Sequence, residues 1–423
     1  PLKDYFDQLQ NKEIKILVPG AGSGYEVEYL FHHGFSNTFL LDFAKIPLTK
    51  FSKSNPQFPD ENLLNEDFFT HEGVYDLILE QTFFCALHPD QREAYCEKMK
   101  TLLLSLLLVP AVALAGEQPD LDIDPDRITV SGISSGAHMA TQLHIAYSDL
   151  FSGAAMLSGG PFNCAGGSLM TAMQLCMTNT EKPLPVTEIA AGIREAAAAG
   201  KIADPANLAD DRVWLFRGKR DSKISGPVHW AAADLYAEFM PADRIRRVDD
   251  IDAEHVFPAQ GHGNSCFEIV APYVGDCDYD AAGEILQYLY PGLDEPAPEA
   301  DGELRQVDLP GAAAASLSET AYLFVPAACA AGDTSCPLHL VLHGCAQSAV
   351  SIGTDFIEQS GYLPWAGGNG IVLAFPQVVP SAVNPLGCWD WWGYTGADYL
   401  WRDGAQMKVI ADWLRTLAGE SQP

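Results

Sequence analysis

The hydrophobic pattern of this chain alternates between short apolar runs and longer segments with helical periodicity. Several runs are short enough to be buried strands, and they lead through glycine-rich turns into segments whose apolar residues recur every three or four positions. Strands that alternate with helices predict an α/β fold. The expected strands are 14–18, 38–41, 127–130, 213–216, 338–342 and 371–375, and the expected helices include 25–31, 137–145 and 406–417.

The basic residues change in type near residue 100, which predicts a boundary between two segments. Residues 1–100 contain eight Lys and one Arg, whereas residues 101–423 contain five Lys and eleven Arg. Lys and Arg serve equally well at most exposed positions, so folding does not require this change, and two segments of different ancestry explain it. We expect a first domain over 1–103 and a second over 116–423, within the two or three domains that 423 residues allow.

A segment with the layout of a secretory signal peptide lies at this boundary, over residues 99–115. Met99 and Lys100 precede an apolar stretch, and Ala113-x-Ala115 supplies small residues for cleavage. A buried core helix is the alternative interpretation. Because the segment is internal, we expect the full chain to stay in the cytoplasm, whereas a protein that begins at Met99 is expected to be secreted or periplasmic.

The charge and the hydropathy exclude several classes of protein. The net charge is −31, and such an acidic surface repels phosphate backbones, so nucleic acid is not an expected partner. Hydrophobic residues make up 48% of the chain and charged residues 19%, which excludes intrinsic disorder. No apolar run reaches the roughly 18 residues of a transmembrane helix, so no membrane span is expected. The sequence leaves the oligomeric state open.

Eight cysteines in the second segment predict a disulfide framework, because an even number after an export signal typically forms disulfides. Two further cysteines, Cys85 and Cys96, precede the boundary. No cluster of Cys and His has the spacing of zinc ligands, so no metal site is expected. Pairing neighbours gives the simplest connectivity, which is Cys164–Cys176, Cys266–Cys277, Cys329–Cys336 and Cys345–Cys388.

The first segment opens with a strand, a glycine-rich turn and a helix. The apolar run 14–18 ends at Pro19-Gly20-Ala21-Gly22-Ser23-Gly24, and the expected helix 25–31 follows. Such a turn lets the backbone approach a nucleotide at the helix N-terminus. The next strand ends at Asp42, which is placed to accept hydrogen bonds from ribose hydroxyls. A plain tight turn is the alternative interpretation.

Residues 17–27, 65–69 and 75–87 resemble thiopurine S-methyltransferase-type enzymes, which use S-adenosylmethionine. The resemblance implies that Gly20, Gly22 and Gly24 line the methionine side of the cofactor, that Asp42 holds the ribose, and that Asp67 and Phe68 lie near the adenine. It extends from about residue 13 to Leu103 and stops after four of the family's seven strands. We therefore expect a half Rossmann-like remnant that at most binds S-adenosylmethionine, and not a working methyltransferase.

A G-x-S-x-G motif stands at a strand-to-helix turn in the second segment. The expected strand 127–130 leads into Gly132-Ile133-Ser134-Ser135-Gly136, and the expected helix 137–145 follows. This is the nucleophile elbow of α/β-hydrolases, in which the glycines avoid clashes while the turn lifts a serine hydroxyl above the sheet. The helix N-terminus and the next backbone N–H then face the developing oxyanion. Ser134 is the predicted nucleophile.

A serine nucleophile needs a base, and the base needs an orienting carboxylate. Asp221 lies in the loop after the expected strand 213–216, and His255 lies in a later loop. The chain order Ser, Asp, His fits the fold class. His262 is the rival base, and a solvated loop carboxylate is the alternative interpretation of Asp221.

One strand is out of the usual order. Residues 338–342 form a buried-strand run that ends at His343-Gly344-Cys345-Ala346-Gln347. In most α/β-hydrolases such a strand and its oxyanion loop precede the nucleophile elbow, whereas here they follow the histidine. The order predicts a circularly permuted α/β-hydrolase.

Five motifs in the second segment resemble single-domain poly(3-hydroxybutyrate) depolymerases over about residues 120–420: residues 132–136, 254–258, 264–266, 342–347 and 384–394. The resemblance implies Ser134, Asp221 and His255 as the triad and the N–H groups of Ser135 and Cys345 as the oxyanion hole. It also implies a Cys345–Cys388 bridge and Trp392 in the polymer-binding crevice, although Trp392 can also be read as a core residue. The sequence departs from the family at Arg217-Gly218-Lys219-Arg220-Asp221, where His-Gly-x-x-Asp is usual.

The sequence therefore predicts a serine esterase that hydrolyses polyhydroxybutyrate or a short ester through an acyl-enzyme, without a cofactor. The alternative function is that of an S-adenosylmethionine-dependent methyltransferase or a cofactor-binding remnant. A third interpretation is a fusion, in which the first hundred residues are appended to a complete hydrolase.

Overall fold

The computed structural model describes residues 12–20, 24–79, 91, 94–95, 98, 102, 119, 121–179, 183–298, 300–332 and 334–420. The chain separates into two compact units, Pro1–Ala113 and Leu114–Pro423. Gly22, Cys85 and Cys96 lie outside the described residues, and so does the signal-like segment 99–115 except for Leu102.

The first unit contains a four-stranded parallel sheet in the order β3-β2-β1-β4. The strands and helices are β1 (Ile16–Pro19), α2 (Tyr25–His32), β2 (Thr38–Leu41), α3 (Lys45–Ser54), β3 (Leu63–Leu64) and β4 (Leu77–Ile78). The expected strand and helix are confirmed, with β1 starting two residues later than expected, while residues 21–23 of the glycine-rich turn lie outside the described residues. The backbone N–H of Lys15 donates instead to the side chain of Asp76, at 2.6 Å.

Gly24, at the start of α2, is required by packing. Its φ is +70°, a left-handed conformation that favours glycine, and a Cβ atom there would overlap the ring of Phe51 on α3. Val27 and Leu30 on α2 are fully buried and pack in the same cluster as Phe51. The third glycine of the turn therefore brings α2 and α3 together over the sheet.

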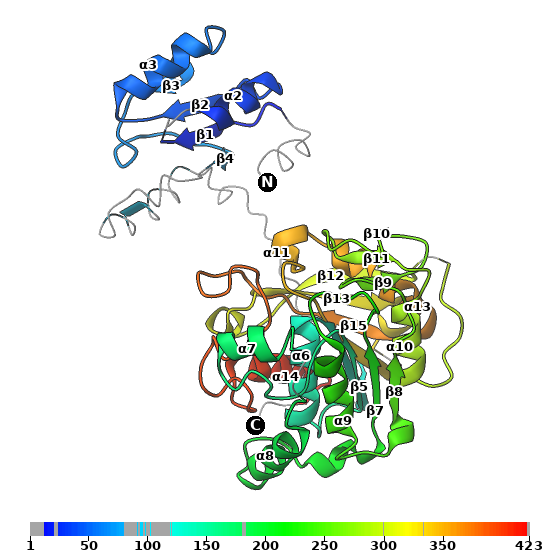
Figure 1. Ribbon diagram of the computed structural model, residues 1–423. Helices are drawn as coiled ribbons and strands as arrows, with labels where there is room; N and C mark the ends of the chain where they lie inside the picture. Colours follow the sequence, from blue (N-terminus) through cyan, green and yellow to red (C-terminus); the bar gives the residue numbers. More distant parts are fainter. Residues whose placement is uncertain are drawn as a thin grey trace. The chain divides into compact units, whose positions relative to one another are not determined.

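The second unit contains a mixed eight-stranded sheet in the order β12-β13-β15-β14-β5-β6-β7-β8 (Figure 1). β12, β13 and β15 pair antiparallel, and every other pair of neighbours is parallel. The strands are β5 (Ile123–Ile133), β6 (Gly153–Leu157), β7 (Arg212–Phe216), β8 (Ile245–Val248), β12 (Gly302–Asp308), β13 (Thr320–Pro326), β14 (Cys336–Leu342) and β15 (Val372–Phe375).

Successive residues of the central strands alternate between two hydrophobic cores, one on each face of the sheet. On β7, Val213 and Leu215 belong to one core, while Trp214 and Phe216 belong to the other. Helices α6, α8, α9 and α14 cover the first face, and α10, α12 and α13 cover the second. This alternation follows from the period of two residues in a strand, and it gives a three-layer α/β/α unit.

The helices of this unit are α6 (Ser135–Ala146), α7 (Leu169–Leu175), α8 (Val186–Ala198), α9 (Gly226–Tyr236), α10 (Ala281–Leu289), α11 (Ala349–Ile352), α12 (Asp355–Gln359), α13 (Tyr362–Asn369) and α14 (Ala405–Leu417). A small sheet in the order β10-β11-β9 lies outside the main one, formed by β9 (Phe257–Ala259), β10 (Asn264–Ser265) and β11 (Val274–Asp276). Among the described residues, no helix is long and apolar enough to cross a membrane.

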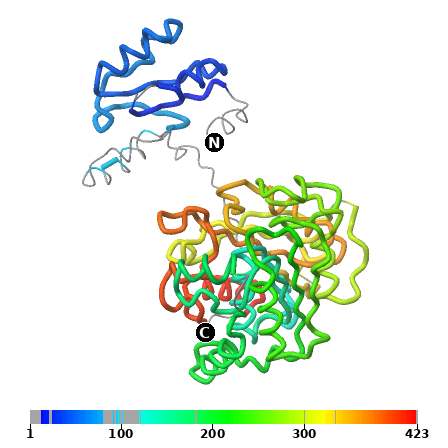
Figure 2. Tube along the Cα trace, in the orientation of Figure 1, coloured from blue at the N-terminus to red at the C-terminus, as the bar shows by residue number. Residues whose placement is uncertain are grey.

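The predicted circular permutation is confirmed by the sheet order. β14 follows β5 by about two hundred residues in the chain, yet the two strands are parallel neighbours in the middle of the sheet, with Leu342 opposite Gly132. Early and late segments of the unit therefore run side by side in its centre (Figure 2). The carboxyl ends of β5 and β14 consequently meet at one edge of the sheet.

A buried polar network ties β5 to β14. The Nδ1 atom of His339 is hydrogen-bonded to the Thr129 hydroxyl at 2.7 Å, and its Nε2 atom to the Ser131 hydroxyl at 2.8 Å. Tyr290, which directly follows α10, and Tyr362 on α13 extend the network, through their hydroxyls, to Thr129 and Ser131 respectively. All five side chains are buried, so their polar atoms satisfy one another where water is excluded.

The four disulfides expected from neighbour pairing are all formed. Each bridges two cysteines of the second unit, over sequence separations of 7 to 43 residues. They are Cys164–Cys176, Cys266–Cys277, Cys329–Cys336 and Cys345–Cys388.

We predict that His339→Leu lowers the free energy of unfolding of the second unit by about 2 kcal/mol, because two buried hydrogen bonds are lost. Urea unfolding followed by fluorescence measures the change. The matched control is His262→Leu, at an exposed histidine, which should stay within about 0.5 kcal/mol of the parent chain. Equal stabilities for the two variants would contradict the prediction.

Candidate active site

Ser134 stands at a sharp turn between β5 and α6. Its φ of +59° and ψ of −119° are unusual for a residue other than glycine, and its backbone N–H donates to the carbonyl of Leu157 at 2.9 Å. A Cβ atom on Gly132 would overlap the carbonyl of Gly136, and one on Gly136 would overlap the carbonyl of Leu342. The two glycines of the motif are therefore required by close backbone contact within the turn and against β14.

Asp221 lies in the loop after β7, where its side chain is buried. Its Oδ1 atom accepts hydrogen bonds from the backbone N–H groups of Lys223 at 2.9 Å and Ile224 at 2.8 Å, and its Oδ2 atom accepts one from Nδ1 of His255 at 3.0 Å. Burial alone raises the pKa of Asp221. The nearby charge of His255 and the hydrogen bonds from His255, Ile224 and Ser158 outweigh it and lower the pKa to about 2.

Arg217 explains why the loop tolerates its unusual sequence before Asp221. The guanidinium donates to the carbonyls of Ile224 at 2.7 Å and Asp221 at 2.9 Å. The side chain thereby closes the turn that presents the carboxylate. The geometry thus brings Asp221 to His255, although the loop lacks the family's usual histidine.

His255 precedes β9 and is held from both sides. Asp221 accepts from its Nδ1 atom, while Oε1 of Glu254 accepts from the backbone N–H groups of His255 at 2.8 Å and Ser222 at 2.6 Å. With the proton on Nδ1, the Nε2 atom carries the lone pair that a general base needs. His255 and Ser134 line the same cavity.

The rival base, His262, lies elsewhere. Its Nε2 atom is 2.7 Å from the carbonyl oxygen of Gln359, its Nδ1 atom is 3.1 Å from that of Gln260, and the residue is exposed. His262 does not line the cavity around Ser134. The geometry therefore favours His255 as the base.

The cavity above Ser134 has a volume of about 260 Å³. Apart from the triad residues, the described lining is largely apolar, and Lys223 is the one Lys or Arg among these described residues. Sequence analysis missed Met177, Lys223 and Tyr273, because no motif marks them, and it gave Gln347 no role although this residue ends a quoted motif. The lining residues are Ile133, Ser134, Met177, Lys223, His255, Ile269, Tyr273, Gly344, Cys345, Ala346, Gln347 and Leu386.

The two predicted oxyanion donors come from different elements, the start of α6 and the loop after β14. Ser135 is the first residue of α6, where a backbone N–H has no partner within the helix. Cys345 follows β14 in a loop that Gln347 shapes, because the Gln347 side chain accepts from the N–H of Gly344 at 2.7 Å and donates to the carbonyl of Pro272 at 3.0 Å. The Cys345–Cys388 bridge joins this loop to the tryptophan-rich segment.

Trp392 does not line the cavity. It is 9% exposed and packs against Trp391 and Tyr394, with ring centroids 5.6 and 5.0 Å away. Cys345, which does line the cavity, packs against the same cluster. The polymer-binding role of Trp392 stays a prediction.

Two buried histidines, His138 and His229, do not line the cavity around Ser134. His138 stacks on Trp391 at 4.1 Å, and His229 contacts the backbone of Gly159. The Nε2 atoms of both histidines have no hydrogen-bond partner among the described residues. Burial lowers the pKa of His138 to about 3 and that of His229 to about 4, so both rings are neutral at ordinary pH.

In the first unit, the residues assigned to a nucleotide are only partly gathered. Gly20 and Asp42 follow the carboxyl ends of neighbouring strands, but the Asp42 carboxylate accepts from the N–H of Ala44 at 2.7 Å. Asp67 caps its own turn by accepting from the N–H of Phe69 at 2.9 Å. Phe68 is 2% exposed and stacks on Tyr95. Gly22 lies outside the described residues, so binding of S-adenosylmethionine by the first unit stays a prediction.

The first part of the chain is similar to methyltransferases. Residues 1–135 match the family model for thiopurine S-methyltransferase. A probable thiol methyltransferase 2 of Arabidopsis thaliana is 33% identical over 115 residues, which cover 25% of this chain and 50% of that protein. The match therefore extends over only half of the methyltransferase.

The rest of the chain is similar to depolymerases. A poly(3-hydroxybutyrate) depolymerase of Delftia acidovorans is 39% identical over 73% of this chain, and the chain spans 63% of its length. A polyhydroxybutyrate depolymerase of Talaromyces funiculosus is 32% identical over 72% of this chain and 93% of its own length. The crystal structure of the Penicillium funiculosum enzyme superposes with a TM-score of 0.68, at 32% identity, over 73% of this chain and all of that one. The chain belongs to the polyhydroxybutyrate depolymerase family.

Proposed function

We propose that the second unit is a serine esterase that hydrolyses the ester bonds of polyhydroxybutyrate and related short-chain polyesters. The observation that carries this proposal is the common cavity of Ser134 and His255, with the buried Asp221 carboxylate hydrogen-bonded to His255. Family membership supports the substrate class, because the similar proteins are named for this polymer and one solved relative holds a trimer of R3HB.

Catalysis proceeds in two half-reactions. Nε2 of His255 takes the proton of the Ser134 hydroxyl as its oxygen attacks the ester carbonyl carbon, and the N–H groups of Ser135 and Cys345 stabilise the oxyanion. The tetrahedral intermediate expels the alkoxide, which takes the proton from His255 and leaves as a hydroxyl-ended fragment. Water, deprotonated by His255, then attacks the acyl-enzyme and releases a carboxylic acid, which restores Ser134. The anionic Asp221 stabilises the protonated imidazole in both steps.

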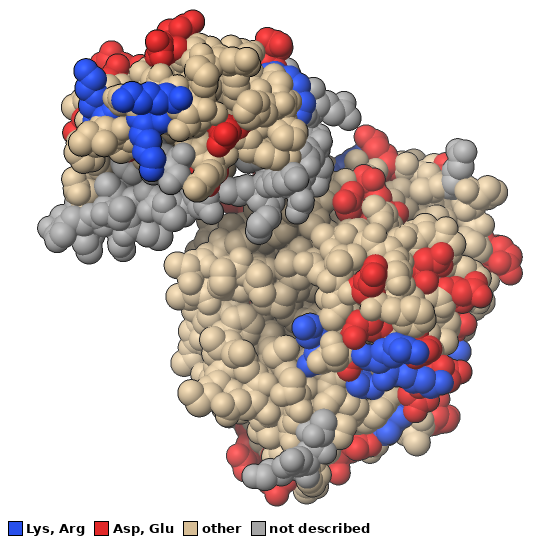
Figure 3. Space-filling model, turned by 45° about the horizontal axis from the view of Figure 1, so that its top comes forward, with Lys and Arg blue, Asp and Glu red and all other residues tan. Residues whose placement is uncertain are grey.

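The surroundings of the cavity suit a neutral, partly apolar substrate. Its lining is rich in apolar side chains, such as Ile133, Ile269 and Leu386, which can contact the methyl groups of a polyester. Lys223 provides a cation that can hold the free carboxylate of a chain end. Figure 3 shows that part of the surface of the second unit carries few charged residues, while its acidic and basic side chains gather elsewhere on that face.

We also propose that the hydrolase works in an oxidising compartment. The four disulfides support this location, because such bonds persist outside the reducing cytosol. A protein that begins at Met99 would carry residues 99–115 as an N-terminal export signal, whereas the same residues are internal in the full chain.

We propose that the first unit is a remnant without methyl transfer activity. Its described residues form four strands of a sheet, and the family match covers half of the related methyltransferases. The substrate pocket that the rest of such a sheet would build is therefore not provided by the described residues.

The expected effect of Ser134→Ala is loss of ester hydrolysis by at least about a thousandfold, because the acyl-enzyme cannot form. The assay follows release of 3-hydroxybutyrate from amorphous polymer and of nitrophenol from a short-chain ester. Ser152→Ala is the matched control. Ser152 immediately precedes β6, at the amino end of that strand and therefore away from the carboxyl ends where Ser134 lies, so this variant should keep the parent rate. Turnover by Ser134→Ala above a few per cent of the parent rate would remove Ser134 from the mechanism.

Acid should destabilise the second unit through its buried neutral histidines. In the unfolded chain a histidine takes up a proton near pH 6.5, whereas folded His138 and His229 stay neutral down to about pH 3 and 4. The unfolded state therefore binds more protons within this window, so the free energy of unfolding falls as the pH falls from about 6.5 toward 3.

His138→Phe removes one of these protonation sites and keeps a ring against Trp391, so we expect its acid-unfolding midpoint to move to lower pH. Fluorescence across a pH series measures the midpoint. His262→Phe, at an exposed ring, should keep the midpoint of the parent chain. A midpoint for His138→Phe at or above that of the parent would contradict the assignment.

For the first unit we expect no methyl transfer from labelled S-adenosylmethionine to an aromatic thiol by the full chain. Ester hydrolysis by the same preparation shows that the protein is folded. Accumulation of more than one methylated product per chain would show that the first unit is a working methyltransferase.

A further inference from the structure

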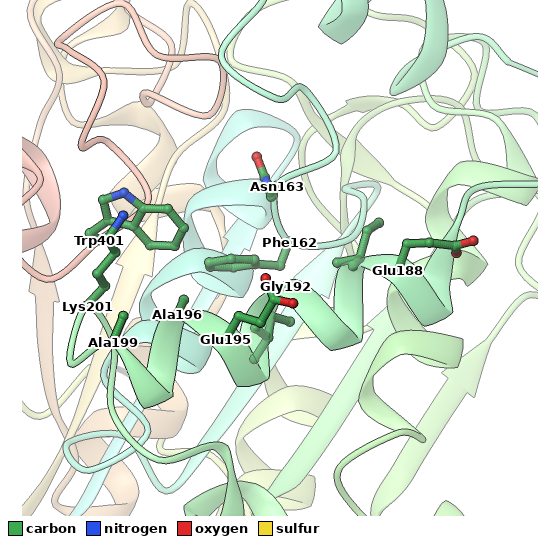
Figure 4. A pocket seen from close by; sticks show the side chains of 11 residues that line it. Phe162, Asn163, Glu188, Gly192, Glu195, Ala196, Ala199, Lys201 and Trp401 are labelled. Carbon is green, nitrogen blue, oxygen red and sulfur yellow. The ribbon is translucent and has the colours of Figure 1, made fainter.

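A second cavity, larger than the one above Ser134, lies along helix α8 (Figure 4). Its volume is about 540 Å³, against about 260 Å³ at the catalytic serine. One face of α8 forms its floor, through residues spaced three or four positions apart. Phe162 and Asn163, from the loop after β6, and Lys201 and Trp401 form the remaining walls.

The floor of this cavity contains a glycine, Gly192, that packing does not require. Gly192 lies inside α8, where glycine costs about 0.5–1 kcal/mol relative to alanine. A Cβ atom at Gly192 would meet nothing within 4 Å, so no neighbour excludes a side chain there. Ala196 and Ala199 continue the same face with short side chains. The helix thus leaves open a space that a larger residue at Gly192 would fill.

Aromatic side chains form the apolar walls. The rings of Phe162 and Trp401 have centroids 6.4 Å apart, and Trp401 is only partly buried. The backbone N–H of Arg402 donates to the carbonyl of Lys201 at 3.0 Å, which holds the Trp401 segment beside the end of α8. A partly exposed indole beside a phenyl ring offers a surface for methyl and methylene groups.

One basic and two acidic side chains line the cavity, with Lys201 at one end, Glu188 at the other and Glu195 between them. The Lys201 ammonium lies 4.9 Å from the centroid of the Trp401 ring, and Figure 4 shows both residues at the opposite end from Glu188. Asn163 lies on the wall between them, and its Oδ1 atom accepts from the hydroxyl of Tyr399 at 3.4 Å, which leaves its amide N–H groups to donate. The stretch of α8 from Glu188 to Ala199 spans about 16 Å at 1.5 Å per residue.

We propose that this cavity, named here the α8 site, binds a short linear oligomer of a hydroxyalkanoate. Such a molecule carries a carboxylate at one end, a hydroxyl at the other and methyl groups along an ester backbone. Lys201 pairs with the carboxylate, Asn163 donates to an ester carbonyl, and Glu188 accepts from the terminal hydroxyl. The assignment of this ligand rests on the proposed esterase function, whose substrates and products have this structure.

The α8 site and the catalytic cavity are connected by one loop. Ser158, which hydrogen-bonds to Asp221, begins the loop, and Phe162 and Asn163 follow within five residues. Oligomers held in the α8 site are therefore retained near the esterase after cleavage. A polymer that is cut repeatedly gains from such retention, because a bound fragment stays at a high local concentration.

The test counts binding sites on the full chain with Ser134→Ala, which cannot consume the ligand. Calorimetric titration with the trimer of 3-hydroxybutyrate should give two sites per chain. Adding Gly192→Leu should leave one site, because the new side chain fills the floor. Ala191→Leu places the same side chain at the adjacent exposed position, which does not line the cavity, and should keep two sites.

The charge pairing is tested separately. Both Lys201→Met and the use of the trimer's methyl ester should weaken binding at the α8 site by about tenfold, because each removes the charge-assisted hydrogen bond. Combining the two changes should weaken it no further. One site on the Ser134→Ala chain, or two sites on its Gly192→Leu derivative, would overturn the proposal.

A chain with intact Ser134 separates this proposal from the proposed function. Gly192→Leu in that background should hydrolyse a short-chain nitrophenyl ester at the parent rate, since the α8 site is not the catalytic cavity. Absence of hydrolysis by the parent chain would refute the esterase function, while the count of trimer sites would still report on the α8 site.

Discussion

The pairing of β5 with β14 is the constraint on which the rest of the hydrolase depends. Ser134 leaves the carboxyl end of β5, and the loop with Cys345 leaves the carboxyl end of β14, so the register between these strands brings the predicted nucleophile near the loop of its predicted oxyanion donor. The backbones approach so closely that Gly136 has no room for a side chain beside Leu342. The buried hydrogen bonds of His339 hold the same two strands a few residues earlier. A slip of one residue would turn each strand's side chains to the wrong face.

Near β5 and β14, burial and the surrounding hydrogen bonds determine whether Asp221, His138 and His339 are charged. Asp221 stays ionised although it is buried, because backbone N–H groups and His255 surround its carboxylate. His138 and His339 stay neutral because nothing compensates a buried positive charge there. The interior thus stabilises one anion, Asp221, next to His255, the predicted base.

The circular permutation shows how little the site depends on chain order. β12 to β15 follow His255 in sequence, yet they occupy the positions that complete the sheet next to β5. Only spatial neighbourhood matters for an oxyanion hole, so a donor loop can come from either end of the domain. The Cys345–Cys388 bridge fastens that loop to a later segment. The first unit has its own sheet and core, which agrees with a separate origin.

The sequence by itself determined the features whose residues are neighbours in the chain. Strand, turn and helix around Ser134 could be predicted because Gly132 and Gly136 carry the steric requirement within five residues. The order of the later strands was sufficient to indicate the permutation. Only the tertiary structure decided between His255 and His262 as the base, and only it placed Lys223 and Gln347 in the cavity and Trp392 outside the cavity's wall. These outcomes depend on contacts between residues far apart in the chain, and those contacts follow from sheet register and loop packing, which no local pattern encodes.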